Sequence, residues 1–273
     1  MREPDPSDLL EIAETAAEQA GKRIARIFHH GRFSVKRKYD YPGSIVTNAD
    51  TESEKIILAR IRASGIKSTI ASEERGRLNY GGRRIIWAVD PLDGTFNFAK
   101  RIPHFAVSIG AIQNGRTVAG AIYDPILDEM FAASRRGGAY LNGKKIGVSM
   151  ATALRDASVI FEWWDKEPLI PDPLDLEKRI YRYTRSLRSP GSIALNLCSV
   201  ACGRFDGLIT VFSKSPVYET PAGAIIVEES GGRVTNSLGE GWEGLSNSII
   251  AAGPKLQRVL LSFVQHGGRS ARV

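Results

Sequence analysis

An apolar run that ends abruptly in two carboxylates is the feature that most constrains how this chain folds. Residues 85–89 read Ile-Ile-Trp-Ala-Val, which is typical of a buried strand, and Asp-Pro-Leu-Asp-Gly-Thr follows at once. A strand that stops here presents the oxygens of Asp90 and Asp93 at its exposed end. Gly94 then permits close backbone approach, and Thr95 offers a hydroxyl and an N–H to an anion. The run suits a divalent metal beside a phosphate, but taken alone it fits an ordinary β-turn equally well.

Three further acidic sites have the same character. The pair Glu73-Glu74 follows a short strand expected at residues 69–71, Asp50 lies at the expected start of a helix, and Glu219 precedes another helix. Each has a simpler explanation when it is taken singly: a solvated strand end, a helix N-cap, or an acid favoured by the helix dipole. Together with the Asp-Pro-Leu-Asp run, they indicate one site that gathers carboxylates.

Composition narrows the class of protein. The 273 residues are 42% hydrophobic and 25% charged, which is an ordinary globular balance with enough length for a sizeable core. The net charge is +7, but the basic residues are scattered, so we expect no nucleic-acid partner. No apolar run approaches the roughly 20 residues of a membrane span. We therefore expect a soluble, cytoplasmic protein with no membrane partner.

Periodicity predicts an α/β (α+β) architecture built from two layered halves. We treat residues 1–273 as a single catalytic domain with approximate subdomains at 1–150 and 151–273. Helices are expected at residues 9–29, 50–65, 174–185, 191–201, 222–230 and 254–266. Strands are expected at residues 69–71, 85–89, 106–112, 116–123, 129–134, 139–148 (a hairpin), 157–161, 207–211 and 248–252. We expect a turn at residues 41–44 and an irregular segment at residues 162–173.

These motifs resemble one family in their order and spacing, over nearly the whole chain. They are Val46-Thr47-x-x-Asp50, Ser72-Glu73-Glu74, Asp90-Pro91-Leu92-Asp93-Gly94-Thr95, Gly191-Ser192-x-Ala194-Leu195, Ala201-x-Gly203-x-x-Asp206 and Glu219-x-x-Ala222-Gly223. The chain is similar to members of the inositol monophosphatase family, among the lithium-sensitive, metal-dependent phosphatases that include fructose-1,6-bisphosphatase. The resemblance implies a layered αβαβα sandwich of the sugar-phosphatase type and a homodimer.

The resemblance also implies a set of metal ligands. Glu73, Asp90 and the backbone carbonyl of Leu92 would hold one Mg²⁺. Asp90, Asp93 and Glu219 would hold a second ion, and Glu73 would help to hold a third, weaker one through water. Carboxylates are suitable ligands for Mg²⁺, and acids packed this closely would repel one another without cations.

Catalytic and substrate-binding roles follow from the same resemblance. Asp50 and Thr95 would form the dyad that orients and deprotonates the attacking water. The N–H groups of Gly94 and Thr95 would hold phosphate oxygens, and Gly191 and Ser192 would lie on the substrate side. The implied activity is Mg²⁺-dependent hydrolysis of a small phosphorylated polyol or sugar, with inositol 1-phosphate first and fructose 1,6-bisphosphate second.

Alternatives remain for the function. A histidinol-phosphate phosphatase and a 3′(2′),5′-bisphosphate nucleotidase are close enzymatic rivals. A weakly active regulator that binds metal or sugar phosphate is the rival from another class.

The chain departs from the family pattern at several positions. Glu219 stands where the family usually has Asp, Asn196 stands where many members carry Asp, and Phe96 replaces a common threonine. Residues 214–217 lack the acidic and polar side chains that grip inositol hydroxyls in well-known members. Lys38 is either a charged neighbour of the metal site or a solvated lysine.

Overall fold

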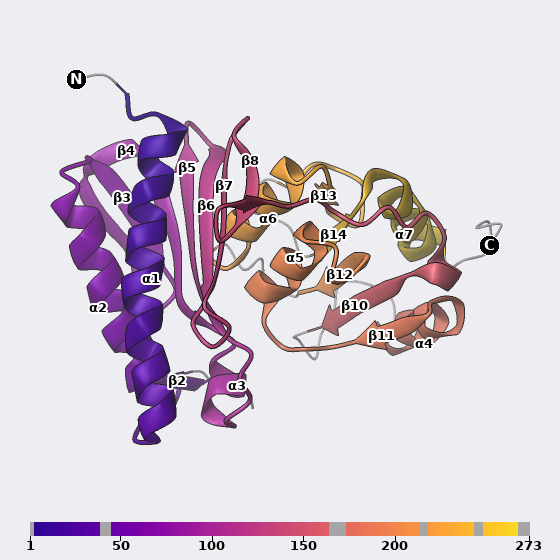
Figure 1. Cartoon of the computed structure of the whole chain (residues 1–273), viewed down its shortest axis with the longest axis horizontal. Helices are drawn as coiled ribbons and strands as arrows, with labels where there is room; N and C mark the ends of the chain where they lie inside the picture. Colours follow the sequence, from indigo (N-terminus) through magenta and orange to yellow (C-terminus); the bar gives the residue numbers. More distant parts are fainter. Residues whose placement is uncertain (1–2, 39–44, 164–172, 213–217, 243–247, 267–273) are drawn as a thin grey trace.

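The computed structural model describes residues 3–38, 45–163, 173–212, 218–242 and 248–266 of the chain. Its elements stack as helices, sheet, helices, sheet and helices, with the N-terminal helices at one end and the C-terminal helix at the other (Figure 1). This order confirms the predicted αβαβα sandwich. The expected turn at residues 41–44, residues 214–217 and most of the expected irregular segment lie outside the described ranges.

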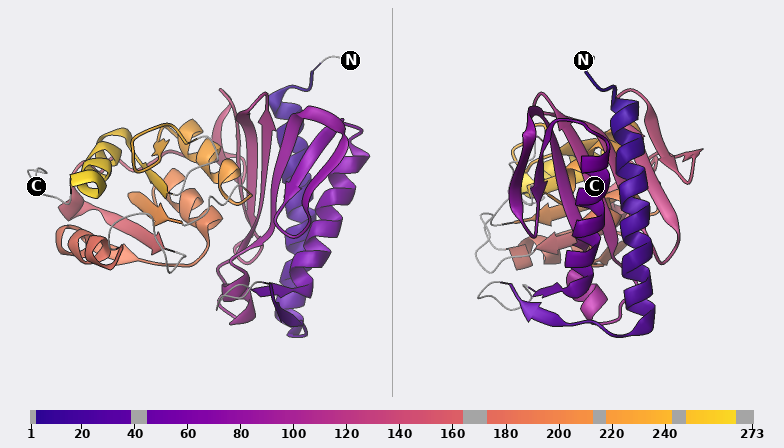
Figure 2. Two further views of the ribbon diagram at one scale, coloured as in Figure 1. Left: turned by 180° about the vertical axis from the view of Figure 1, so that it is seen from behind. Right: turned by 90° about the vertical axis from the view of Figure 1, so that its left-hand side faces the viewer.

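Two long helices form the outer layer at the N-terminal end. Helix α1 spans Pro6–His30 and helix α2 spans Asn48–Ala63, and both lie across the same face of the larger sheet (Figure 2). Both were expected from their apolar periodicity, and each begins two or three residues earlier than predicted. Their apolar faces and the facing side of the sheet form the first buried cluster of the core.

The larger sheet carries most of the chain's first half. Within the described ranges it has seven strands, in the order β3-β4-β5-β6-β7-β8-β9. Their bounds are β3 Ser68–Ser72, β4 Gly76–Asp93, β5 Ala106–Gln113, β6 Arg116–Asp124, β7 Glu129–Ser134, β8 Gly138–Leu141 and β9 Lys144–Lys145. The predicted meander is confirmed.

Strand β4 is far longer than the strand predicted at residues 85–89. Its two arms both pair with β3, so that Ile70 lies opposite Leu78 on one side and Trp87 on the other. The chain reverses between the arms at Gly81, which has a φ of +79°. Charged and glycine residues in the first arm hide its strand character from the sequence pattern.

The smaller sheet has five strands in the described residues, in the order β11-β10-β12-β14-β13. Their bounds are β10 Ser158–Trp163, β11 Ser186–Arg188, β12 Gly207–Val211, β13 Arg233–Thr235 and β14 Ser248–Ala252. The edge strands β11 and β13 were not predicted, because three residues are too few to show a period. The irregular segment was predicted to begin at residue 162, but β10 continues to Trp163.

Four helices cover the smaller sheet. Helices α5 (Ile193–Ala201) and α6 (Thr220–Glu229) lie between the two sheets, and α4 (Pro173–Tyr183) and α7 (Pro254–His266) cover the outer face (Figure 1). The middle helices and the outer helices each have their own buried cluster. The helix predicted to reach residue 185 ends at Tyr183, where the chain passes into β11. The remaining short elements are β1 Val35–Arg37, β2 Ile45–Thr47, α3 Thr95–Ala99 and η1 Leu154–Asp156.

None of the helices in the described ranges is long and apolar enough to cross a membrane.

Close packing of α6 on the larger sheet depends on a glycine. A Cβ added to Gly120 of β6 would lie 2.7 Å from the Cα and 2.8 Å from the carbonyl oxygen of Ala222. Both are backbone atoms of α6, so the helix would have to move away from the sheet. We expect Gly120→Ala to lower the free energy of unfolding by about 1–3 kcal/mol, as overpacked cores do.

Urea unfolding followed by circular dichroism measures this change. Gly147→Ala is the matched control, because the nearest atom to its added Cβ is 3.7 Å away. Equal unfolding midpoints for the two variants would contradict the predicted clash.

Candidate metal and phosphate site

Three carboxylates converge where the larger sheet meets the middle helices. One oxygen from each of Glu73, Asp90 and Glu219 lies within 4.8 Å of the others. Glu73 follows β3, Asp90 lies in β4, and Glu219 is the N-cap residue of α6. The chain thus brings together acids that are more than 140 residues apart in sequence. This all-oxygen, carboxylate-rich donor set fits a hard divalent cation such as Mg²⁺.

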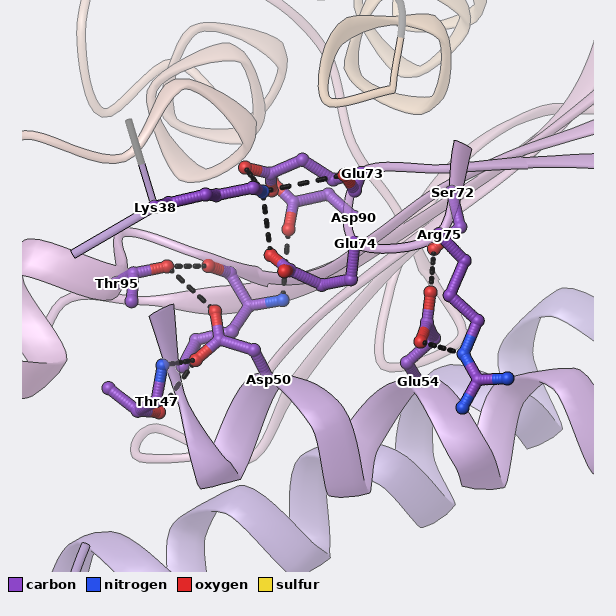
Figure 3. A network of polar contacts seen from close by, with 11 residues as sticks. Lys38, Thr47, Asp50, Glu54, Ser72, Glu73, Glu74, Arg75, Asp90 and Thr95 are labelled. Atoms are coloured by element: carbon purple, nitrogen blue, oxygen red, sulfur yellow. Dashed lines mark hydrogen bonds and ion pairs between the residues drawn. The ribbon is translucent and has the colours of Figure 1, made fainter. Parts of the chain in front are cut away.

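One face of α2 supports the two turns that carry these acids. The Ser53 hydroxyl donates to the carbonyl of Pro91 at 2.6 Å, within the Asp-Pro-Leu-Asp turn. The buried Glu54 carboxylate accepts from the Ser72 hydroxyl at 2.6 Å and from Arg75 Nε at 2.8 Å, on either side of Glu73 (Figure 3). Neither Ser53 nor Glu54 was predicted. The sequence does contain a sign of their role, because Ser53 and Glu54 are polar residues on the otherwise apolar face of a helix.

Asp50 occupies the first turn of the same helix and contacts Thr95. Its Oδ2 accepts from the backbone N–H and the hydroxyl of Thr47, at 2.8 and 2.6 Å, so it closes a capping box. Its Oδ1 accepts from the Thr95 hydroxyl at 3.0 Å, and that hydroxyl also lies 2.8 Å from the carbonyl oxygen of Leu92 (Figure 3). Thr95 has one hydroxyl proton, so these two acceptors compete for it. Asp50 is thus both a capping residue and a partner of Thr95.

Asp93 is held from the opposite side by α5. Its Oδ2 accepts from the Ser192 hydroxyl and from the backbone N–H of Ala194, the latter at 2.9 Å. Ser192, expected on the substrate side, is fully buried, and its hydroxyl is directed to Asp93. The helix N-terminus and this hydroxyl favour the ionised carboxylate. Asp93 therefore connects the larger sheet to the middle helices.

Gly94 and Gly191 lie where the backbone passes closely by other groups. Gly94 has a φ of +87°, and a Cβ there would lie 2.9 Å from the carbonyl oxygen of His104. Gly191 has a φ of +90°, and its Cβ would lie 3.1 Å from the side-chain nitrogen of Asn97. Both positions suit glycine for conformational and steric reasons. Gly94 and Thr95 are each partly exposed at the start of α3.

Lys38 is a charged neighbour of the site and not a solvated lysine. Its ammonium lies 2.8 Å from Glu73 Oε1 and 2.8 Å from Glu74 Oε1, with 13% of the side chain exposed (Figure 3). Burial opposes the charge of Lys38, but the two carboxylates outweigh it and raise the pKa of the lysine. An ammonium in this position neutralises part of the acidic cluster and competes with a cation for Glu73.

The clustered acids favour protonation when no cation offsets their charge. Burial raises the pKa of Asp90 well above its usual value, and repulsion from Glu73 and Glu219 raises it further. Burial, followed by repulsion from Glu73 and Asp93, raises the pKa of Glu219 in the same way. Burial also raises the pKa of Asp50 to about 7, even though its hydrogen bonds from Thr47 oppose the shift. A cation bound among these groups would be strongly stabilised by their ionised forms.

The chain is similar to known proteins over nearly its whole length. The model of the inositol monophosphatase family matches residues 5–267. The Nus factor SuhB of Escherichia coli K12 is 35% identical over 257 residues, which cover 93% of this chain and 94% of that protein. The inositol-1-monophosphatase of Bacillus subtilis is 33% identical over 263 residues, covering 95% of this chain and 97% of that protein.

A solved structure supports the same relationship. The extragenic suppressor protein SuhB of Bartonella henselae superposes with a TM-score of 0.87 at 31% identity, covering 95% of this chain and 99% of that one.

The raised pKa of Asp50 predicts a specific pH dependence of stability. Burial raises the pKa of Asp50 to about 7 in the folded protein, whereas in the unfolded chain its pKa has the ordinary value of 3.8. The folded state binds more protons in this window, so the free energy of unfolding falls as the pH rises from 4 to 7. Asp50→Asn removes this titration, and its stability curve should be shallower by up to about 1.4 kcal/mol per pH unit.

Urea unfolding at several pH values between 5 and 8, with a chelator present, tests this. Parallel stability curves for the parent protein and Asp50→Asn would show that Asp50 titrates normally in the folded state.

Proposed function

The chain belongs to the inositol monophosphatase family, whose members depend on metal, and we propose that it is a Mg²⁺-dependent phosphomonoesterase. The observation that carries the proposal is the convergence of Glu73, Asp90 and Glu219 beside the Asp50–Thr95 pair. A cluster of hard oxygen ligands next to a hydroxyl–carboxylate pair suits phosphoryl transfer to water. We propose that water attacks phosphorus directly, with no covalent intermediate on the protein.

We assign the metal ligands from the resemblance and from the contacts of each group. Glu73, Asp90 and the carbonyl of Leu92 would hold one Mg²⁺, and Asp90, Asp93 and Glu219 a second. Glu73 would also help to hold a third, weaker ion. Bound Mg²⁺ supplies Lewis acidity, which offsets phosphate charge and makes water a better nucleophile. The acids themselves hold their ions in place and repel one another less once these are bound.

The Asp50–Thr95 pair is proposed to orient the attacking water. When the carbonyl of Leu92 serves as a ligand, Asp50 is the acceptor left for the Thr95 hydroxyl proton. The threonine oxygen would then accept a proton from the attacking water while its own hydroxyl proton passes to Asp50. Asp50 is held in place for this role by its two hydrogen bonds from Thr47.

The phosphate is proposed to bind at the start of α3. The backbone N–H groups of Gly94 and Thr95 lie on a partly exposed turn directly after Asp93. Donors in this position suit phosphate oxygens that approach the acidic cluster together with cations. Gly191 lies across from this turn against Asn97 and is the residue we assign to the substrate side.

We propose inositol 1-phosphate as the lead substrate, with fructose 1,6-bisphosphate as a possible second one. The inositol-1-monophosphatase of B. subtilis supports this choice by its name and by the 95% of this chain that its match covers. Histidinol phosphate and a 3′(2′),5′-bisphosphate nucleotide are the alternatives to be assayed beside it. The homodimer and the cytoplasmic location expected from sequence stay predictions.

A weakly active regulator that binds metal or sugar phosphate is the second candidate. Two observations favour it: Glu219 stands where the family usually has Asp, and the E. coli relative is named as a Nus factor. Glu219 nevertheless lies within the carboxylate cluster, which favours an intact metal site and hence the enzyme.

A phosphate-release panel with Mg²⁺ tests the enzyme proposal. We expect turnover of inositol 1-phosphate. Asp93→Asn should lower this activity by more than roughly 100-fold, because losing a metal ligand costs more than losing a residue that only supports a ligand. Asp175→Asn, on the outer helix α4, is the control and should keep full activity. Activity on the nucleotide alone would overturn the substrate proposal, and full activity in Asp93→Asn would refute the ligand assignment.

Glu219→Asp separates the enzyme from the regulator. We expect an active parent protein, and a variant that needs about 10-fold more Mg²⁺ for half-maximal activity because its shorter carboxylate reaches less far toward Asp90. Glu228→Asp, at the other end of the same helix, should leave the Mg²⁺ requirement unchanged. An inert parent protein that Glu219→Asp activates would favour the regulator instead.

A further inference from the structure

Glu162 is a buried carboxylate that none of the roles above explains. It lies in β10 of the smaller sheet and is 2% exposed. No lysine or arginine in the described ranges forms an ion pair with it. A buried carboxylate without a cationic partner is costly, and burial raises the pKa of Glu162 even though the backbone N–H of Gly191 and the side chain of Asn196 oppose the shift.

The main contact of Glu162 is with the turn before α5. Its Oε1 accepts the backbone N–H of Gly191 at 2.6 Å, which is a short, charge-assisted bond. From helix α3, which follows β4 of the larger sheet, Asn97 Nδ2 donates to the carbonyl of Pro190 at 2.9 Å and approaches that of Gly191 at 3.3 Å. The turn is therefore held from two sides, by one bond from β10 and by the others from α3.

The clamped turn leads directly into the groups that hold Asp93. Ser192 and Ala194 follow Gly191, and both donate to Asp93 Oδ2. These described bonds use one oxygen of the carboxylate and leave Oδ1 for a cation. Because Ser192 and Ala194 move with the turn, displacing the turn would change the orientation of the Asp93 carboxylate. Glu162 also repels Asp93, since its negative charge contributes to the raised pKa of that carboxyl.

We propose that Glu162 is a positioning residue for the second metal ion, acting on it through the Gly191–Ala194 turn and Asp93. The proposal rests on the ligand role assigned to Asp93. Glu162 keeps Asp93 in one orientation, with Oδ1 left for the cation. Partners of this kind, one contact removed from the metal, set its affinity by orienting the ligand.

Mn²⁺ binding to the metal-free protein tests the proposal, with free Mn²⁺ measured by electron paramagnetic resonance. Glu162→Gln keeps the side-chain shape but removes the charge and weakens the bond to Gly191. We expect it to bind the second Mn²⁺ ion, the one assigned to Asp93, about 10-fold less tightly. In an Asp93→Asn background the same substitution should have no further effect, because the residue acts through Asp93.

Thr210→Val is the matched control. Thr210 lies directly opposite Glu162 on β12, is fully buried, and its hydroxyl has no hydrogen-bond partner in the described ranges. We expect its Mn²⁺ isotherm to match that of the parent protein. Near-ultraviolet circular dichroism of each variant reports on its tertiary packing.

Three outcomes would overturn the proposal: an unchanged isotherm in Glu162→Gln, an equal loss in the Asp93→Asn background, or an equal loss in Thr210→Val. Failure of the proposed function is a separate result. A parent protein that binds Mn²⁺ but releases phosphate from no substrate refutes the proposed phosphatase activity. The Mn²⁺ affinities of the parent, the two single variants and the double variant still decide the role of Glu162.

Discussion

Repulsion among clustered carboxylates is the constraint on which this structure depends. Glu73, Asp90 and Glu219 present oxygens within 4.8 Å of one another, and Asp93 adds a further charge nearby. Such a cluster is unfavourable unless cations, protons or fixed donors balance it. The fold supplies the donors: α2 and α5 hold the acid-bearing turns in place, and the ammonium of Lys38 neutralises part of the charge. The carboxylates that would bind a cation are therefore the same side chains that destabilise the fold when no cation is bound.

The site belongs to both halves of the molecule. The larger sheet and α2 place Glu73, Asp90 and Asp50, whereas the middle helices hold Asp93 and contribute Glu219. Asp93 is the link, because it stands on a strand of one half and is hydrogen-bonded by the first turn of a helix in the other. The distance between the two sheets must therefore allow the first turn of α5 to reach Asp93 with hydrogen bonds of normal length. Glycines without room for a Cβ, such as Gly120 beneath α6, set that spacing.

Sequence patterns predicted the long elements and missed the short or interrupted ones. Helix α7 was predicted with its observed bounds, and the meander from β5 to β7 was predicted to within a residue or two. Their apolar periodicity continues long enough to be unambiguous. The first arm of β4 was missed because its charged and glycine residues break the alternation, and β11 was left unassigned because it has only three residues. A three-residue edge strand takes its structure from its neighbour, and its own residues do not reveal it.

The sequence by itself determined the chemistry of the site. Acids followed by glycine and threonine at the end of an apolar strand offer hard oxygen atoms beside backbone N–H groups, because these properties belong to residue types and local spacing. Tertiary structure decided which groups serve these ligands. Ser192 was expected on the substrate side, and its hydroxyl donates to Asp93. The sequence left two alternatives for Lys38, which forms an ion pair with Glu73. The contact between Glu162 and Gly191 was not predicted. Such roles depend on distances between segments far apart in the chain, which only packing of the two sheets establishes.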